Sequence, residues 1–319
     1  MSSRVSIIIP NWNGCQHLAT CLSSLRSQSF TDHEVILVDN DSSDQSVSYV
    51  QQNFPEVKVI VLDKNRGFTG ACNAGYARSQ GDYIVLLNND TEAEKEWLAE
   101  LVEAFEQDKT VGSVMGKIML FDQRDHFHSA GDYYRIDGVP GNRGVWQEDR
   151  GQYDHQEYVF SACGAAAAYR RSMLEEIGFL DERFYFSCED VDVGWRAHLA
   201  GWRVLYVPSA IVYHKVKASS DGVTASYYDG RNYLYLIWKN YPTSLLRRHW
   251  RSVLVAQLRI GWHALRSWRG AAARARLRGQ LAGLLGIFSF RSSRRQIQNS
   301  RRVPDEKLAE LMTPVDGTP

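Results

Sequence analysis

The sequence has no C-x-x-C pair, and its five cysteines form an odd set between residues 15 and 188. Proteins that depend on disulfides usually carry an even set, so buried reduced thiols are expected. No stretch reaches the roughly 18 consecutive apolar residues that cross a bilayer, and the apolar run after Arg4 is too short for the core of a signal peptide. These absences argue against a disulfide-stapled secreted domain and predict a cytosolic protein.

Acidic residues are absent from one long segment. Residues 243–302 hold fourteen arginines and no Asp, Glu or Lys, whereas all 37 acidic residues lie elsewhere. Because the totals of basic and acidic residues are equal, the net charge predicts nothing about partners, but the distribution does. We predict an acidic domain, 1–242, followed by a basic helical region, 243–319, with a frayed end from Pro304 onward.

Apolar β-branched runs alternate with helical patterns in the first half of the chain. This alternation, with short connections, predicts an α/β fold on a mostly parallel sheet with helices on both faces. The expected strands are 4–10, 33–41, 57–63 and 82–90, the expected helices between them are 14–30, 42–54 and 67–80, and a further helix is expected to start at Thr91. The alternating pattern of strands and helices is less clear after Gly112, where residues 116–122 are the clearest strand. A late strand is expected to end at His214.

Polar side chains stand at the end of every one of these first four strands. They are Asn11, residues 39–41, residues 63–65 and residues 88–90. Parallel strands present their carboxyl ends at the same rim, where ligands bind in such folds. The pattern therefore predicts one shared site.

Asn88, Asn89 and Asp90 at the end of the fourth strand allow two interpretations. Asp90 or Thr91 would serve as the N-cap of a following helix. Alternatively, these oxygen-bearing side chains belong to a site for a hard cation and the phosphates that it carries.

Six segments in order carry a family resemblance: "VSIIIPNWNG", "VILVDNDSSDQS", "NRGFTGACNAG", "YIVLLNNDT", "GFLDERFYFSCEDVDVGWRAHLAGW" and "IVYH". Together they resemble the family 2 glycosyltransferases of GT-A fold, and most of all a bacterial rhamnosyltransferase-like subgroup, over roughly residues 4–242. The resemblance implies an inverting enzyme that moves a sugar, rhamnose as first guess, from a dTDP- or UDP-sugar to a saccharide hydroxyl. The acceptor implied is lipid-linked, in cell-surface polysaccharide synthesis.

The resemblance also implies contacts with the nucleotide-sugar donor. Asp39 would accept a hydrogen bond from the imide N–H of uracil or thymine, although capping of the next helix is the alternative. The glycine-bearing loop at residues 65–75 opens a helix whose free N–H groups suit a pyrophosphate, although a plain tight turn would look the same. The implied donor contacts are Pro10, Asn11, Asn13, Asp39, Asp41, Asn65, Gly67, Asn73, Asn88 and Asn89.

A divalent metal, Mn²⁺ or Mg²⁺, is the cofactor that the resemblance implies. Asp90 would be the direct ligand, and His214 would complete the metal shell, which favours Mn²⁺. The departure from the family is Asn88, which replaces the first acid of the D-x-D motif and makes the site less anionic. By itself, a lone His after an apolar run is usually structural.

Catalytic base and acceptor contacts follow from the same resemblance. It implies that Asp190 deprotonates the acceptor and that Glu189 tunes it, although acids in a first helical turn also complement the helix dipole. Trp195 is expected in the core. The remaining acceptor-side or uncertain candidates are Gly164, Asp192, Arg196 and Arg231.

The basic region alternates apolar residues and arginines at helical spacing, with Trp250, Trp262 and Trp268 among them. Basic amphipathic helices of this kind lie on anionic bilayers. This predicts peripheral attachment of residues 243–302 to the inner face of the cytoplasmic membrane. Helices packed on the catalytic body are the alternative, and nothing else in the chain supports nucleic-acid binding. A rival function is a membrane-docked nucleotide-sugar-binding protein with weak or no turnover, which the loss of the first D-x-D acid would fit.

Overall fold

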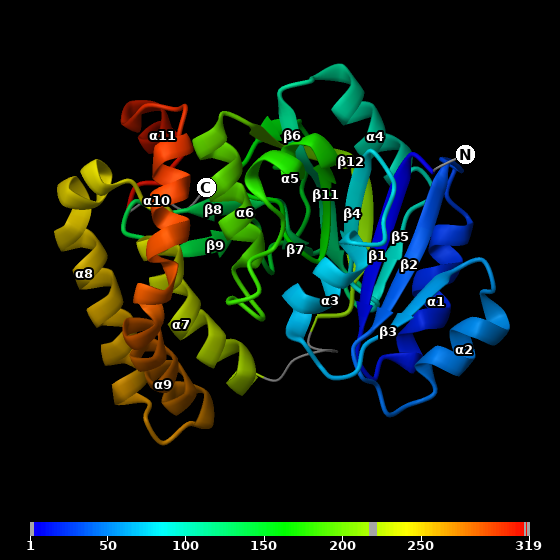
Figure 1. Ribbon diagram of the computed structural model, residues 1–319, viewed down its shortest axis with the longest axis horizontal. Coiled ribbons are helices and arrows are strands. Elements are labelled where there is room, and N and C mark those ends of the chain that lie inside the picture. The colour runs from blue at the N-terminus through cyan, green and yellow to red at the C-terminus, as the bar shows by residue number, and fades with distance from the viewer. Residues whose placement is uncertain (1–2, 217–221, 316, 318–319) are drawn as a thin grey trace.

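A computed structural model describes residues 3–216, 222–315 and 317. A central sheet crosses the molecule, with helices on both of its sides (Figure 1). The predicted early strands and helices are confirmed: β1 (Val5–Asn11), α1 (Cys15–Arg26), β2 (His33–Asp39), α2 (Ser46–Asn53), β3 (Lys58–Val61), α3 (Gly67–Tyr76) and β4 (Tyr83–Leu87). Strands β3, β2, β1 and β4 are parallel neighbours in that order, so their carboxyl ends share one rim as expected.

Beyond β4 the sheet becomes mixed. Strand β11 (Ala166–Arg170) runs antiparallel between β4 and β6 (Val111–Leu120), and β12 (Arg203–His214) then pairs in parallel with β6. Short strands complete the edges and a separate hairpin: β5 (Thr91–Ala93), β7 (Phe127–Ser129), β8 (Asp132–Tyr134), β9 (Pro140–Asn142) and β10 (Glu157–Tyr158). Parallel pairing is therefore confined to β1–β4 and to the β6–β12 pair.

The expected helix start at Thr91 is wrong. Residues Thr91–Ala93 form β5, which pairs antiparallel with β12, and α4 (Trp97–Gln107) begins six residues later with Glu96 before it. The β-branched Thr91 lies opposite His214 in this pairing. Asp90 is thus no helix cap, and the register brings it to the end of β12.

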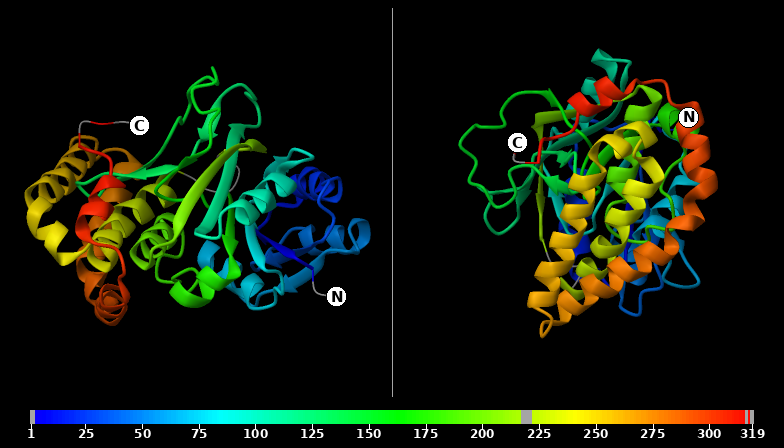
Figure 2. Two further views of the ribbon diagram at one scale, coloured as in Figure 1. Left: turned by 90° about the horizontal axis from the view of Figure 1, so that it is seen from above. Right: turned by 90° about the vertical axis from the view of Figure 1, so that its left-hand side faces the viewer.

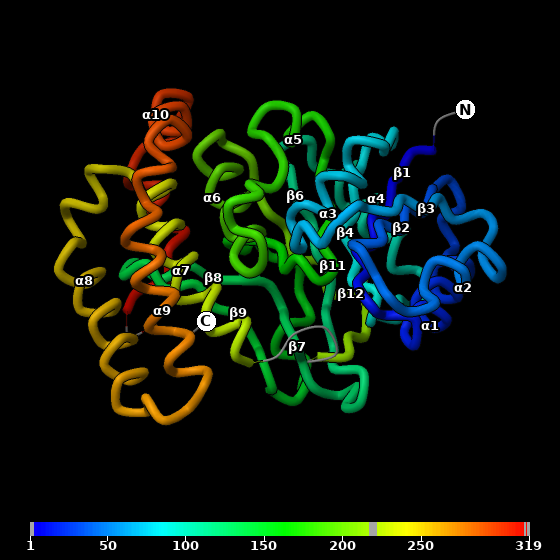
Figure 3. Tube along the Cα trace, turned by 60° about the horizontal axis from the view of Figure 1, so that its bottom comes forward, coloured from blue at the N-terminus to red at the C-terminus, as the bar shows by residue number. Residues whose placement is uncertain are grey.

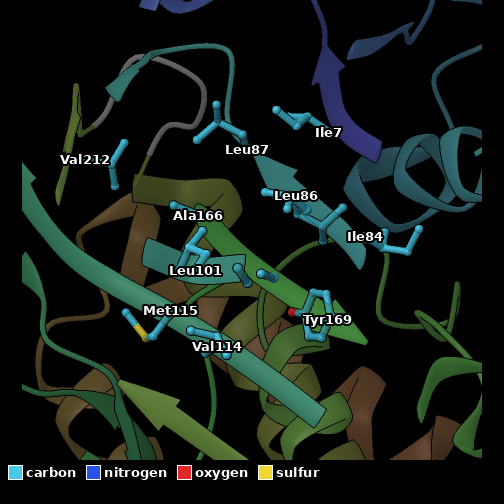
Figure 4. Close-up of a cluster of buried hydrophobic side chains, with 14 of the residues drawn as sticks. Ile7, Ile84, Leu86, Leu87, Leu101, Val114, Met115, Ala166, Tyr169 and Val212 are labelled. Atoms are coloured by element: carbon cyan, nitrogen blue, oxygen red, sulfur yellow. The ribbon is translucent and has the colours of Figure 1, made fainter. Parts of the chain in front are cut away.

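The main core lies between the sheet and its covering helices. Figure 4 shows side chains of β4, β6 and β11, such as Ile84, Val114 and Tyr169, gathered with Leu101 of α4. The small residues of β11 lie in this core, and Ala166 and Ala167 are fully buried. All five cysteines are free, as expected, and four of them are buried.

The basic region forms helices at the end of the molecule away from β1–β3 (Figures 1 and 2). Helix α9 runs alongside α7 (Figure 3). Gly279 permits this contact, because a Cβ there would lie 2.0 Å from the carbonyl oxygen of Tyr227. The α-helices from residue 171 onward are α5 (Arg171–Ile177), α6 (Glu189–Ala200), α7 (Gly222–Asn240), α8 (Thr243–Arg266), α9 (Ala271–Gly286), α10 (Arg291–Ser300) and α11 (Asp305–Glu310).

A second core joins the basic region to the α/β body of residues 3–242. Trp195, in the core as expected, shares this cluster with Tyr241 and Leu245 on either side of the predicted boundary, and with Phe290. The expectation of a frayed end is wrong for residues 305–313, because Leu308 of α11 is 1% exposed and Thr313 pairs with the backbone beside β8. Among the described residues, no helix combines the length and apolar character needed to span a bilayer.

Candidate active site

A pocket of about 360 Å³ opens where β4 and β12 end and α6 begins. Predicted residues from distant parts of the sequence meet there. Those lining it are Asn88, Gly164, Glu189, Asp190 and His214. Other lining residues were not predicted, and they include His128, Asp132, Asn142, Cys163 and Cys188.

Asp90 and His214 lie in contact beside this pocket. His214 Nε2 is 3.1 Å from Asp90 Oδ1 and 3.3 Å from Asn88 Nδ2. Both the carboxylate and the imidazole are buried, and the backbone N–H of Lys215 donates to the carbonyl of Asp90 (2.9 Å), which ties the two chain segments together. A carboxylate and an imidazole converging in this way fit a divalent cation, although the described residues contain no group of three or more such ligands.

His128 of β7 is a site residue that the sequence analysis missed. Its Nδ1 lies 3.0 Å from Nδ1 of His214, and the ring centroids are 4.7 Å apart. Burial, together with the nearby ring of His214, lowers the pKa of His128 to about 3, so the ring is neutral at pH 7. No recognisable motif surrounds this histidine, and β7 is only three residues long.

The two predicted catalytic carboxyls stand in the first turn of α6. Asp190 is partly exposed, and it accepts hydrogen bonds from the backbone N–H groups of Gly164 (2.8 Å, to Oδ2) and Val191 (2.7 Å, to Oδ1). Burial raises the pKa of Asp190 despite these bonds. Gly164 lines the pocket and meets Asp190 through its N–H group, and a Cβ there would lie 3.3 Å from Asp190 Oδ2.

Glu189 is buried beside Asp190. Burial raises the pKa of Glu189 well above its usual range, and the neighbouring Asp190 raises it further. Within the described chain, Glu189 Oε2 is buried without a hydrogen-bond partner. Two carboxyls held in this way cannot both ionise easily, because each charge opposes the other.

We expect Glu189→Gln to raise the melting temperature at pH 8 by at least about 2 °C. The pKa of Glu189 is higher in the folded protein than in the unfolded chain. Folding therefore becomes less favourable when the pH rises above the pKa of the unfolded chain, and a neutral amide removes that cost. The gain should shrink as pH falls toward 4, where the carboxyl is protonated in both states. Melting curves at both pH values check this, and an equal shift at the two would contradict the electrostatic cause.

Asp132 of β8 is a third carboxyl of the pocket, and the sequence analysis missed it. It accepts hydrogen bonds from Asn142 Nδ2 (2.7 Å) and Ser161 Oγ (3.1 Å). Burial raises the pKa of Asp132 well above its usual range, and Asp190 adds to the shift. Its place in a segment of weak periodicity gave no signal.

A strained loop leads into α6. Tyr185, Ser187 and Cys188 all have φ between 64° and 69°, which non-glycine residues rarely adopt. Asn232 of α7 holds the loop by donating from Nδ2 to the carbonyls of Phe184 (3.1 Å), Phe186 (2.9 Å) and Ser187 (2.7 Å). This loop therefore fixes where α6 starts and where its first two carboxyls stand.

The same loop touches the predicted glycine-bearing donor loop. Tyr185 lies against Gly67, whose φ is 71° and whose added Cβ would meet Tyr185 at 2.6 Å. Asn65 Oδ1 accepts hydrogen bonds from Gly67 N–H (2.9 Å) and Tyr185 Oη (3.2 Å). Asn73 of α3 donates to the carbonyl of Leu180 (2.9 Å). These contacts join Asn65, Gly67 and Asn73 to the segment that precedes α6.

A second predicted group of donor contacts stands at the ends of β1 and β2. Asn11 Nδ2 donates to Asp39 Oδ2 (3.2 Å), and Asn89 Nδ2 donates to Asn11 Oδ1 (2.6 Å). Asp39 Oδ1 also accepts the N–H of Ser42 (3.0 Å) and so stabilises the turn after β2, but it does not cap α2, which begins at Ser46 after Gln45. Both carboxylate oxygens keep free acceptor capacity after one bond each.

Nearby loop residues complete this rim. Pro10 lies within β1, and Asn13, with φ of 52°, accepts the N–H of Ser43 through Oδ1 (2.8 Å). Asp41 is exposed and has φ of 67°. The geometry therefore gathers the predicted donor residues at the rim of β1–β4.

Three predicted acceptor-side or uncertain residues serve packing instead. Asp192 is fully buried and bonds with Arg196 Nε (2.9 Å) and Lys239 Nζ (2.8 Å). Arg196 also donates to the carbonyls of residues 177–179, and Arg231 donates to those of residues 183 and 184. Their charges are satisfied inside the protein, so we do not retain them as acceptor contacts.

Comparison with known proteins identifies the family of this chain. Residues 6–178 match the family described as Glycosyl transferase family 2. The chain belongs to this family. The N-acetylglucosaminyl-diphospho-decaprenol L-rhamnosyltransferase of Mycobacterium tuberculosis (strain ATCC 25618 / H37Rv) is 26% identical over 95% of this chain and 97% of its own length. The O-antigen biosynthesis protein RfbC of Myxococcus xanthus is 30% identical over 68% of this chain but only 18% of its own length.

Solved structures confirm the predicted GT-A fold. GalNAc-T7, crystallised with UDP, GalNAc and Mn²⁺, superposes with a TM-score of 0.61 at 18% identity, over 78% of this chain and 50% of that chain. A mannosyltransferase of Pyrobaculum calidifontis in complex with GDP-Man and Mn²⁺ gives a TM-score of 0.57 at 15% identity, over 98% and 84%. Together with the mycobacterial relative, these findings confirm the rhamnosyltransferase-like family 2 resemblance seen in the sequence.

Proposed function

We propose that this protein is an inverting, metal-dependent glycosyltransferase that moves a sugar from a dTDP- or UDP-sugar to a hydroxyl of a lipid-linked saccharide. Rhamnose is the first choice of sugar, because the mycobacterial relative is an L-rhamnosyltransferase acting on a diphospho-decaprenol-linked sugar. The observation that carries the proposal is one pocket that joins His214, paired with Asp90, to the carboxyls of Glu189 and Asp190. Release of dTDP from dTDP-rhamnose, dependent on an added lipid-linked N-acetylglucosamine acceptor, tests it.

Asp190 acts as the general base in this proposal. As the acceptor oxygen attacks the anomeric carbon from the face opposite the diphosphate, its proton passes to the carboxylate of Asp190 and the bond to the diphosphate breaks. Configuration at that carbon is therefore inverted. The N–H groups of Gly164 and Val191 hold the carboxylate in place, and its raised pKa makes it a stronger base than an exposed aspartate.

Asp90 and His214 would hold the divalent cation, with Asn88 beside them. A bound cation supplies charge compensation for the departing diphosphate. Because the family's first D-x-D acid is Asn88 here, the protein offers one carboxylate at this place, and we expect the cation to bind firmly only together with the nucleotide.

Asp90→Ala is expected to weaken binding of the donor diphosphate in the presence of Mn²⁺ and to abolish the metal dependence of the remaining activity. The reason is loss of the carboxylate that faces His214 at 3.1 Å. His214→Ala should weaken Mn²⁺ binding less, because water can replace one imidazole. Calorimetric titration of UDP or dTDP with and without Mn²⁺ measures both effects, and unchanged affinity in Asp90→Ala would contradict the metal assignment.

We further propose that α8 and α9 attach the enzyme to an anionic membrane at the cytoplasmic face. Helix α8 contacts α9, buries Val253, Ala256 and Ala264, and leaves its other side exposed. The exposed apolar residues of the two helices are Trp250, Leu254, Val255, Leu258, Trp262, Leu265, Leu281, Leu284 and Leu285. In the described chain, Arg248, Arg251 and Arg259 on α8 form no ion pair, so their charges remain available to lipid phosphates. This would bring the pocket to a lipid-linked acceptor.

A further inference from the structure

His128 is held by a short, well-anchored strand. Strand β7 pairs antiparallel with β6, and Phe127 and Ser129 on either side of His128 are fully buried. Side chains alternate between the two faces of a strand. His128 therefore points away from its two buried neighbours and lines the pocket beside His214.

Hydrogen-bond geometry restricts the protons of the two imidazoles. The Nδ1 atoms of His128 and His214 lie 3.0 Å apart, so one of them donates and the other accepts. A neutral imidazole has one N–H donor and one acceptor nitrogen. If a cation takes the lone pair of His214 Nε2, the proton of the neutral ring resides on Nδ1, and that N–H needs an acceptor.

We propose that His128 is a positioning residue that accepts the Nδ1–H of His214 and so directs the Nε2 lone pair of His214 toward Asp90 and a divalent cation. This proposal rests on the metal site of the proposed function. Ligand histidines commonly have such a partner on the other ring nitrogen, and its loss typically lowers metal affinity by about 10- to 100-fold. His128 fills this role with an imidazole from a different strand.

Two substitutions at position 128 separate the hydrogen bond from the bulk of the side chain. His128→Asn retains an amide oxygen near the place of Nδ1, whereas His128→Phe retains a ring without an acceptor. In Mn²⁺ titrations followed by electron paramagnetic resonance with saturating UDP or dTDP, we expect His128→Phe to bind Mn²⁺ at least about 10-fold more weakly. His128→Asn should stay within about threefold of the wild-type protein because its acceptor is retained.

The His214→Ala variant distinguishes failure of this proposal from failure of the metal site. If His214→Ala weakens Mn²⁺ binding and His128→Phe does not, the positioning role is overturned while the metal site stands. If neither variant changes Mn²⁺ binding, both proposals fall.

A measurement on the wild-type protein keeps the proposal testable even if His128→Phe does not fold. Long-range ¹H–¹⁵N correlation spectra with Cd²⁺ as a diamagnetic probe and UDP should show the proton of His214 on Nδ1. A proton that stays on Nε2, while Cd²⁺ is bound, overturns the proposal.

Discussion

Replacing Asp190 by Asn is expected to reduce sugar transfer by at least about 10²-fold, the low end of the contribution of a general base. The amide keeps the size of the side chain and its oxygen can still accept the N–H of Gly164, but it cannot take the acceptor's proton. Because the base acts on the acceptor, affinity for the nucleotide sugar should remain within a few-fold. Transfer rates and calorimetric donor titrations measure the two quantities, and near-normal turnover would end the assignment of Asp190 as base.

The pH dependence of transfer provides a control for this role. Asp190 can accept a proton only in its ionised form. The usual pKa of an aspartate is about 4, and burial raises the pKa of Asp190. The wild-type rate should therefore begin to fall, as the pH is lowered, at a pH above that usual value. Glu189→Gln should leave that acid limb nearly in place, because the pKa of Glu189 is raised well above its usual range and its carboxyl is still neutral where Asp190 ionises. An acid limb that moves clearly to lower pH would show that Glu189 is charged there and raises the pKa of Asp190.

The early strands were predictable because each contains a short apolar run; β1, β2 and β4 are largely buried, whereas β3 is only partly buried. Strand β5 was not, because residues 91–96 are mostly polar and their conformation depends on pairing with β12, more than one hundred residues later. The same pairing excludes the helix-cap interpretation of Asp90. The register of pairing with a distant strand cannot be predicted from a local sequence pattern.

Candidate site residues divide along similar physical lines. Asp90, Asp190 and His214 were found because they belong to recognisable motifs, whereas Asp132 and His128 lie on three-residue strands without a pattern. Asp192 was misassigned because two residues along a helix correspond to a rotation of about 200°. That rotation turns it from the pocket side of Asp190 toward Lys239 in the core.

Substituting serine for Arg248, Arg251 and Arg259 together is expected to reduce binding to anionic vesicles by roughly 10²-fold. Each arginine near an anionic surface contributes about 1 kcal/mol, and about 1.4 kcal/mol corresponds to a tenfold change in binding. Sedimentation with phosphatidylglycerol vesicles measures the effect. Serine at Arg26, Arg78 and Arg150, which lie outside the basic region, is the matched control and should leave binding unchanged.

Salt and apolar substitutions separate the two sources of attachment on α8. Near 1 M salt the Debye length is only about 3 Å, so the arginine contribution should largely disappear in the wild-type protein. Insertion of Trp250, Leu258 and Trp262, which are 51–63% exposed, should leave a salt-resistant part of the binding, and replacing these three residues by serine should remove it.

These surface variants are preferable to truncation at Pro242, because truncation would remove Leu245, Phe290 and Leu308 from the second core and destabilise the whole protein. Transfer to a short soluble acceptor should remain unchanged in all of them, whereas transfer to a lipid-linked acceptor in vesicles should fall. If the wild-type protein does not bind anionic vesicles, the exposed face of α8 has another role and the membrane proposal is wrong.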